Sequence, residues 1–94
     1  MRFSSDPAKD AANIAKHGLS LADANLVYDA PNKLTLTSPR GAEARWMDLA
    51  TVAVAGVVLV LVYVRRHADE VHPISLRRAS KIERKLYADW HETP

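Results

Sequence analysis

The chain of 94 residues contains no cysteine. This absence excludes a disulfide scaffold, a zinc site built on thiolates and a cysteine nucleophile. Glycine is scarce, with only Gly18, Gly41 and Gly56, which leaves no glycine-rich loop to hold the phosphates of a nucleotide. The sequence also lacks a G-x-S-x-G nucleophile elbow and an H-E-x-x-H metal motif. No pair of its histidines has metal-ligand spacing, so we expect no metal and no cofactor.

The sequence has almost no excess of charge of one sign, because thirteen basic and eleven acidic residues give a net charge of +2. An excess this small does not by itself indicate a nucleic-acid-binding protein. The apolar share of 48% is ordinary for a globular domain, and the length predicts a single domain over residues 1–94. No apolar signal segment is visible near the start, so the cytoplasm is the expected compartment.

One long apolar run, Leu49–Val64, raises the question of a membrane. It is shorter than the 18 or more residues that a spanning helix usually needs. It is also rich in valine and has Gly56 near its middle, and β-branched residues favour strands. Two buried strands joined near Gly56 therefore explain the run better than a membrane span, and we expect no membrane association.

Helical signals mark both ends of the chain. Asp6 is a suitable N-cap and Gly18 a suitable left-handed stop for a first helix. A second helix is predicted to begin after Ser20 and to end before Pro31. A third begins with a capping box of Ser80 and Glu83. Its spacing predicts an apolar stripe of Ile82, Leu86 and Trp90, with Lys81, Arg84 and Lys85 turned toward water.

Four strands are predicted between the second and third helices: Lys33–Thr37, Glu43–Ala55, Val57–Arg66 and about Glu70–Leu76. Pro73 in the last of these strands predicts an edge position or a bulge, because proline has no N–H to donate. The order of helix, helix, four strands and helix predicts an α+β fold with helices packed on a mainly antiparallel sheet. Trp46 and Trp90 are expected to pack in the thin core rather than to stack on bases.

Positive charge gathers between Arg65 and Lys85, where seven basic residues face three acidic ones. Arg66 and Arg77 each end a predicted strand, so strand pairing could bring them to related edges, and guanidinium groups suit phosphate oxygens. Solvated surface charge is the alternative interpretation of this cluster.

His17 follows Lys9 and Lys16 on one predicted helix face, next to the helix C-terminus where the dipole favours a positive charge. An imidazole can act as general acid or base near neutral pH, and the two lysines could hold a phosphate. The alternative is a histidine that only answers the helix dipole.

Two separated motifs resemble a known family. The opening reads F-x-x-D-P-x-K-x-x-x-N-x-x-K-H-G from Phe3 to Gly18, and the end reads I-S-x-R-x-A-S-x-x-E-R-x-x-Y from Ile74 to Tyr87. Between them, Glu43 and Arg45 give E-x-R, and Val62 to Arg66 gives V-Y-x-x-R. In this order and length the chain resembles the BrnT-type toxins of bacterial type II toxin–antitoxin systems.

The resemblance implies a RelE-like fold and a small metal-independent ribonuclease that inhibits translation. It implies a BrnA-type ribbon-helix-helix antitoxin as partner in a hetero-oligomer, which contacts operator DNA mainly through the antitoxin. RNA is the implied substrate. Carried over by position, the candidates for catalysis are His17, Arg66, Arg77 and Lys9, and those for RNA binding are Lys16, Tyr63, Arg78 and Lys81. His17 would move the proton, while Arg66, Arg77 and Lys9 would clamp the phosphate, so Arg77→Ala should abolish toxicity with the fold intact.

Departures from the family pattern keep a second function open. Ser5 stands where an aromatic residue is common, and His72 and Pro73 stand where a basic or apolar strand residue is usual. A non-catalytic module that binds an antitoxin or nucleic acid would retain the same fold and the same basic residues. Growth arrest on induction, and its loss on substitution of Arg66 or Arg77, would separate the two functions.

Overall fold

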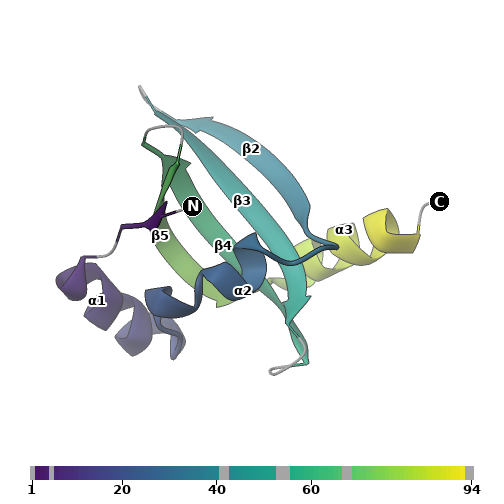
Figure 1. Ribbon diagram of the computed structural model, residues 1–94. Helices are drawn as coiled ribbons and strands as arrows, with labels where there is room; N and C mark the ends of the chain where they lie inside the picture. The colour runs from purple at the N-terminus through teal and green to yellow at the C-terminus, as the bar shows by residue number, and fades with distance from the viewer. Residues whose placement is uncertain (1, 5, 41–42, 53–55, 67–68, 93–94) are drawn as a thin grey trace.

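The computed structural model describes residues 2–4, 6–40, 43–52, 56–66 and 69–92. Within them the secondary structure is α+β, as predicted (Figure 1). The elements in chain order are β1 Arg2–Phe3, α1 Pro7–His17, the 3₁₀ helix η1 Leu21–Asp23, α2 Asn25–Tyr28, β2 Leu34–Arg40, β3 Glu43–Val52, β4 Val57–Arg65, β5 Glu70–Arg78 and α3 Lys81–Glu92.

The sheet has the strand order β1-β5-β4-β3-β2. Its four long strands pair antiparallel, which confirms the prediction, and each lies beside its neighbour in sequence. The two-residue β1 adds a parallel edge through Arg2–Glu70 and Phe3–Val71 pairs, which the sequence analysis did not predict. Ala55, the predicted end of the strand that begins at Glu43, lies outside the described residues, as does Ser5.

The apolar run Leu49–Val64 is divided between β3 and β4, as predicted. Gly56 precedes β4 with a φ of 64°, a backbone conformation that glycine adopts without steric cost, and its N–H donates to the Val52 carbonyl at 2.7 Å. Among the residues that the structure describes, no helix is both long enough and apolar enough to cross a bilayer.

Pro73 lies at a bulge, as predicted. Val62 pairs with Ser75 and Tyr63 pairs with Pro73, so Ile74 is an extra residue on β5. The insertion shifts the register and bends the strand beside the proline. It also determines which side chains of β5 face each side of the sheet.

Helix α1 has the predicted ends. Its N-cap Asp6 accepts a hydrogen bond from the Ala8 N–H at 2.9 Å, and Gly18 closes it with a φ of 71°. The second predicted helix is different, because its first turn is the 3₁₀ helix η1 and only Asn25–Tyr28 is α-helical. The buried residues Leu21, Ala24 and Val27 recur every third position, and the tighter 3₁₀ turn aligns residues at that spacing.

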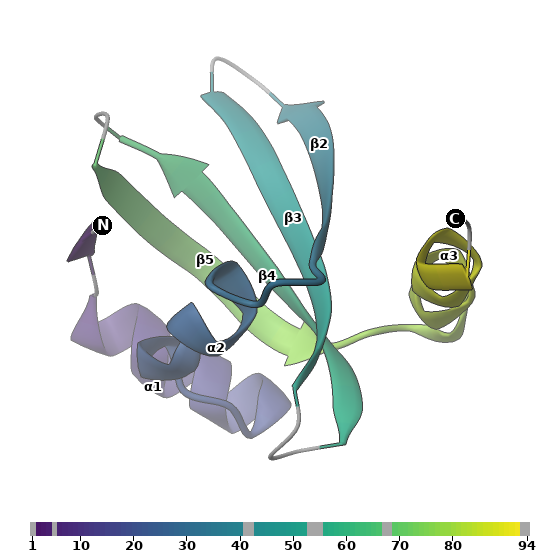
Figure 2. The ribbon, with the colours of Figure 1, turned by 45° about the vertical axis from the view of Figure 1, so that its right-hand side comes forward.

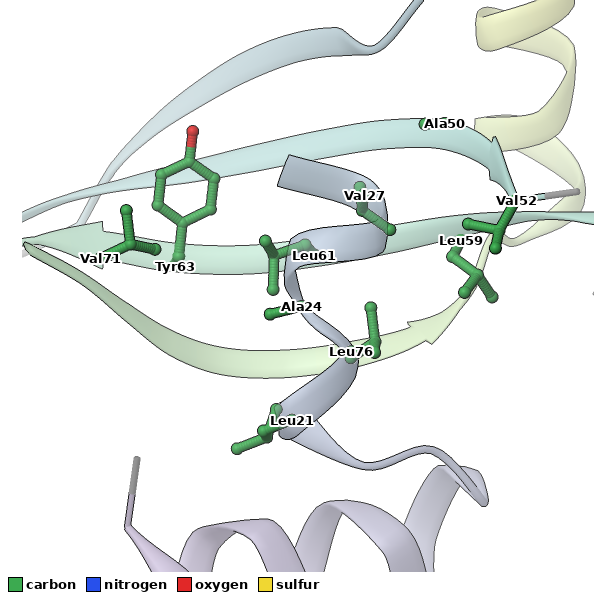
Figure 3. Close-up of a cluster of buried hydrophobic side chains, with 10 residues drawn as sticks. All are labelled: Leu21, Ala24, Val27, Ala50, Val52, Leu59, Leu61, Tyr63, Val71 and Leu76. Atoms are coloured by element: carbon green, nitrogen blue, oxygen red, sulfur yellow. The ribbon is translucent and has the colours of Figure 1, made fainter. Parts of the chain in front are cut away.

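A cluster of buried side chains joins η1 and α2 to one face of the sheet (Figure 3). Its members are Leu21, Ala24, Val27, Ala50, Val52, Leu59, Leu61, Tyr63, Val71 and Leu76. Trp46 packs against this cluster as predicted, and the Arg65 guanidinium lies 4.7 Å from its ring centroid. This face of the sheet is therefore the one that η1 and α2 cover.

The opposite face is covered in part by α3, which lies apart from α1 and α2 (Figure 2). Tyr87 alone is buried on this helix, against Leu49 and Val60, and its hydroxyl donates to the Asn32 carbonyl at 3.0 Å. The predicted apolar stripe points elsewhere: Ile82 is 81% exposed, and Leu86 and Trp90 are also exposed. The packing predicted for Trp90 is therefore wrong for the core, although its ring contacts that of Tyr87.

Candidate functional site

A groove runs between α1 and β5 at the sheet edge. Its volume is about 280 Å³, and it is lined by Lys9, Ala12, Asn13, Lys16, His17, Ile74 and Ser75. Three predicted site residues, Lys9, Lys16 and His17, therefore share one groove, as their helical spacing indicated. Because Lys9 contacts His72 and Asn13 contacts Leu76, α1 and β5 run in the same direction.

Asn13 fixes α1 against the strand. Its side-chain amide donates to the Leu76 carbonyl at 2.9 Å and to the Leu19 carbonyl at 2.8 Å, and its Oδ1 accepts from the Leu76 N–H at 3.2 Å. The amide pairs with the Leu76 backbone as a neighbouring strand would, beyond the short stretch where β1 pairs with β5. Asn13 therefore holds α1, which forms one wall of the groove, against β5.

His72, which the sequence analysis did not select as a site residue, lies beside Lys9 of the groove, and the positive charge of Arg66 acts on its ring. The Lys9 Nζ lies 3.5 Å from the His72 Nε2, and the Ser4 Oγ lies 2.7 Å from its Nδ1. Burial is the main cause that lowers the pKa of His72 below 6.5, and the positive charges of Arg66 and Lys9 lower it further. No spacing in the sequence signals this cluster, since its members lie up to 68 residues apart.

Arg77 lies at the other end of β5. Antiparallel pairing sets Arg65 opposite Val71 and Val60 opposite Arg77, so Arg66 and Arg77 are about 20 Å apart at the strand rise of ~3.3 Å per residue. The prediction that they come to related edges and clamp one phosphate is therefore wrong. The end of one antiparallel strand lies beside the start of the next.

The Arg77 guanidinium is held by Glu83. Its two nitrogens donate to the two carboxylate oxygens at 2.6 and 2.8 Å, and Glu83 Oε1 also accepts from the Ser80 N–H at 2.8 Å in the predicted capping box. The hydrogen bond from Arg77 is the main cause that lowers the pKa of Glu83 to about 2. The pair therefore stabilises the fold above pH 4.5, and this contribution is lost as the pH falls from 4.5 toward 2. We therefore expect Arg77→Ala to lower stability as well as to remove a candidate site residue.

Glu83→Gln should separate the structural role of Arg77 from RNA binding. Glutamine retains the capping box but removes the charge that holds Arg77, so stability should fall by about 2 kcal/mol, as for a lost hydrogen bond to a charged group. If Arg77 contacts phosphate, the freed guanidinium should raise the affinity for a labelled RNA severalfold in fluorescence anisotropy. An unchanged affinity together with reduced stability would leave Arg77 a structural role alone.

The remaining predicted RNA-binding residues do not line the groove. Arg78 pairs with Leu59, which belongs to the cluster under α2, so alternation directs it to the opposite side of β5 from Arg77. Lys81 is exposed at the start of α3.

Tyr63 is completely buried, so its predicted contact with RNA is wrong in this structure. Its hydroxyl donates to the Asp48 Oδ1 at 3.2 Å. Burial first, and then the charge of Asp48, raise the pKa of Tyr63, which keeps the phenol protonated as a donor. The sequence around a tyrosine on an apolar strand is the same whether its side chain faces the core or a ligand. Only the strand register determines which of the two faces it occupies.

The described side chains can therefore transfer a proton and bind a phosphate. Beside the groove, the His72 imidazole lies next to the Lys9 ammonium, and Arg66 lies at the same end of the β4–β5 hairpin. These groups are suited to proton transfer and to binding a phosphate. Further along, Lys16 and His17 line the groove. In the described part of the chain, no three His, Asp or Glu side chains are grouped so as to hold a metal ion.

Comparison with known proteins gives one family. The family model described as "Ribonuclease toxin, BrnT, of type II toxin-antitoxin system" matches residues 6–83. No curated protein sequence matches the chain. The crystal structure of the Brucella abortus ribonuclease toxin BrnT is similar in fold, with a TM-score of 0.61 and 24% identity over 86% of this chain and 96% of that one. The α+β fold built up above, and a family match over most of the sequence, lead to the same conclusion: the chain belongs to the BrnT family of ribonuclease toxins of type II toxin–antitoxin systems.

Proposed function

We propose that this BrnT-family chain is a metal-independent endoribonuclease, formed by a single toxin domain over residues 1–94, that cleaves RNA in the cytoplasm and thereby inhibits translation. A BrnA-type ribbon-helix-helix antitoxin neutralises it, and operator DNA is contacted through that antitoxin. The observation that carries the proposal is the contact of Lys9 with His72 beside the α1–β5 groove, with Arg66 at the same end of the β4–β5 hairpin.

Metal-free cleavage of RNA uses the ribose 2′-hydroxyl as nucleophile. Its oxygen attacks the adjacent phosphorus while the bond to the 5′-oxygen breaks, which leaves a 2′,3′-cyclic phosphate and a 5′-hydroxyl. A base must take the 2′ proton, an acid must protonate the 5′-oxygen, and cations must stabilise the charge on the phosphorane. Positive side chains and an imidazole in one groove supply those roles.

The distances divide these roles along the groove. Lys9 contacts His72, and Arg66 lies at the same end of the β4–β5 hairpin, so in this proposal both hold the phosphate that is cleaved. His17 follows Lys9 by eight residues, which is about 12 Å along the helix axis at ~1.5 Å per residue. Lys16, His17 and, once released by Glu83, Arg77 then bind the RNA backbone further along.

The test is induction of the chain in a bacterial host without antitoxin. The parent should arrest growth, while Lys9→Ala and Arg66→Ala, each shown to accumulate as folded protein, should restore it. Sustained growth with abundant folded parent protein would contradict the nuclease and favour the non-catalytic binding module.

The antitoxin binds, in this proposal, to the apolar stripe of Ile82, Leu86 and Trp90 on α3. All three side chains are exposed on one face of the helix, and an amphipathic partner helix buries such a face. We expect Ile82→Ser with Leu86→Ser to abolish neutralisation by co-expressed antitoxin while the isolated variant still arrests growth. The same double variant remaining neutralised would move the antitoxin interface away from α3.

A further inference from the structure

The surroundings of His72 are formed by three separate segments of the chain. It lies on β5 and is 9% exposed, the Ser4 hydroxyl that follows β1 lies 2.7 Å from its Nδ1, and Lys9 from α1 lies 3.5 Å from its Nε2. Its partner across the sheet is Val64. The ring is therefore fixed at one nitrogen by a short hydrogen bond and meets the groove at the other.

The contacts determine which nitrogen carries the proton. The Lys9 ammonium offers only donors, so Nε2 must accept from it. Nδ1 then carries the hydrogen and donates to the Ser4 oxygen. The free electron pair of the neutral ring is thus at Nε2, on the side of Lys9 and the groove.

The charges around the ring favour the neutral form. Arg66 after β4 and Lys9 on α1 are positive, whereas Glu70 on β5 and Asp6 at the cap of α1 are negative and act more weakly on His72. With burial as the largest cause, the pKa of His72 falls below 6.5. A neutral imidazole at pH 7 can accept a proton without first losing one.

We propose that His72 is the general base of RNA cleavage in this chain, an inference that rests on the proposed ribonuclease function. The 2′-hydroxyl of the ribose takes the place of the Lys9 ammonium at Nε2 and gives its proton to that nitrogen. Its oxygen bonds to phosphorus, and the bond to the 5′-oxygen breaks, with that oxygen protonated by water. Lys9 and Arg66 stabilise the phosphorane, and Ser4 is a positioning residue that fixes the ring.

Geometry favours His72 over His17 for this role. Lys9 contacts the His72 ring directly, whereas His17 is about 12 Å further along the axis of α1. The pairing of β5 with β4 places His72 and Arg66 at the same end of that hairpin. One phosphate can therefore touch Lys9, Arg66 and His72 together.

The experiment is the pH profile of cleavage of a short RNA, with excess chelator, by the parent, His72→Gln and His17→Gln. For the parent, kcat/KM should fall as the pH drops through the pKa of His72, below 6.5, and NMR titration of the ring should give the same midpoint. His72→Gln should lose roughly 10²–10⁴-fold in kcat, as for removal of a general base, with KM changed far less and the acidic limb absent. His17→Gln should change KM and retain the limb.

Two further variants keep the inference testable if His72→Gln is unstable. Lys9→Gln removes a positive charge beside the ring, so the acidic limb and the NMR midpoint should both move to higher pH. Ser4→Ala should lower kcat and leave the groove intact.

An acidic limb that persists in His72→Gln, or that disappears only in His17→Gln, would overturn the role of His72 while leaving the nuclease standing. RNA left intact by the folded parent would overturn both the nuclease and this inference.

Discussion

Asp48→Ala should lower the free energy of unfolding by about 3–5 kcal/mol, the usual cost of removing one partner of a buried ion pair. The Asp48 carboxylate is completely buried on β3. It accepts from the Lys33 ammonium at 2.9 Å, from the Thr35 hydroxyl at 2.7 Å and from the Tyr63 hydroxyl at 3.2 Å. Alanine leaves all three donors without this acceptor.

Lys33 increases the loss of stability in Asp48→Ala, because its charge would be left without the carboxylate at a position where the side chain is only 25% exposed. Its ammonium lies 4.0 Å from the centroid of the Tyr28 ring. A domain of this size is stable by roughly 5–14 kcal/mol, so the variant should lose much of its stability. Urea denaturation followed by circular dichroism measures the change.

Asp23→Ala, at an exposed position of η1, is the matched control and should change stability by no more than about 0.5 kcal/mol. A double variant, Lys33→Met with Asp48→Leu, should be more stable than Asp48→Ala, since replacing both charges by apolar groups is often neutral. A loss below about 1 kcal/mol for Asp48→Ala would contradict the network as a source of stability.

Asn13→Ala should destabilise the protein by about 3 kcal/mol, because it leaves the buried backbone groups of Leu76 and the partly buried Leu19 carbonyl without this partner, at ~1–3 kcal/mol for each buried group. For a domain of this length, the melting temperature should fall by roughly 15 °C. The effect should exceed that of other polar substitutions on α1, because Asn13 is the buried residue of that helix.

Asn25→Ala is the control, an asparagine that is exposed at the start of α2. The melting temperature of Asn13→Asp should lie between those of Asn13→Ala and Asn25→Ala. The reason is that a carboxylate can still accept from the Leu76 N–H but cannot donate to the carbonyls. Equal melting temperatures for Asn13→Ala and Asn25→Ala would show that the edge of β5 does not depend on the amide.

Local sequence patterns predicted most of the elements for physical reasons. Caps such as Asp6 and Gly18 act within one turn, and the apolar run on either side of Gly56 needed only strand propensity and a turn. Pro73 indicated a bulge because a missing N–H is a local property. Each of these signals acts between residues close in sequence.

The wrong predictions for α3 and Tyr63 depend on which distant residues meet. The side of α3 that faces the sheet is the one that carries Tyr87, which packs against Leu49 and Val60, and not the stripe of Ile82, Leu86 and Trp90. Tyr63 and Asp48 meet through strand register. A shift of one residue would reverse the faces of a strand, so apolar content alone could not assign Tyr63 to the core.

The candidate site shows the same division. Helical spacing was enough to place Lys9, Lys16 and His17 along one groove. The distance between Arg66 and Arg77 needed the antiparallel register of β4 and β5, and the cluster around His72 needed the packing of α1 against β5.

The most direct measurement of the central claim is incubation of total RNA with the purified chain in excess chelator, beside Arg66→Ala with its folding verified. The account predicts that the parent cleaves RNA and leaves 2′,3′-cyclic phosphate ends, and that Arg66→Ala does not, because the phosphorane then lacks its guanidinium. Intact RNA with the folded parent, or equal cleavage by Arg66→Ala, would contradict a metal-independent nuclease centred on the start of the α1–β5 groove.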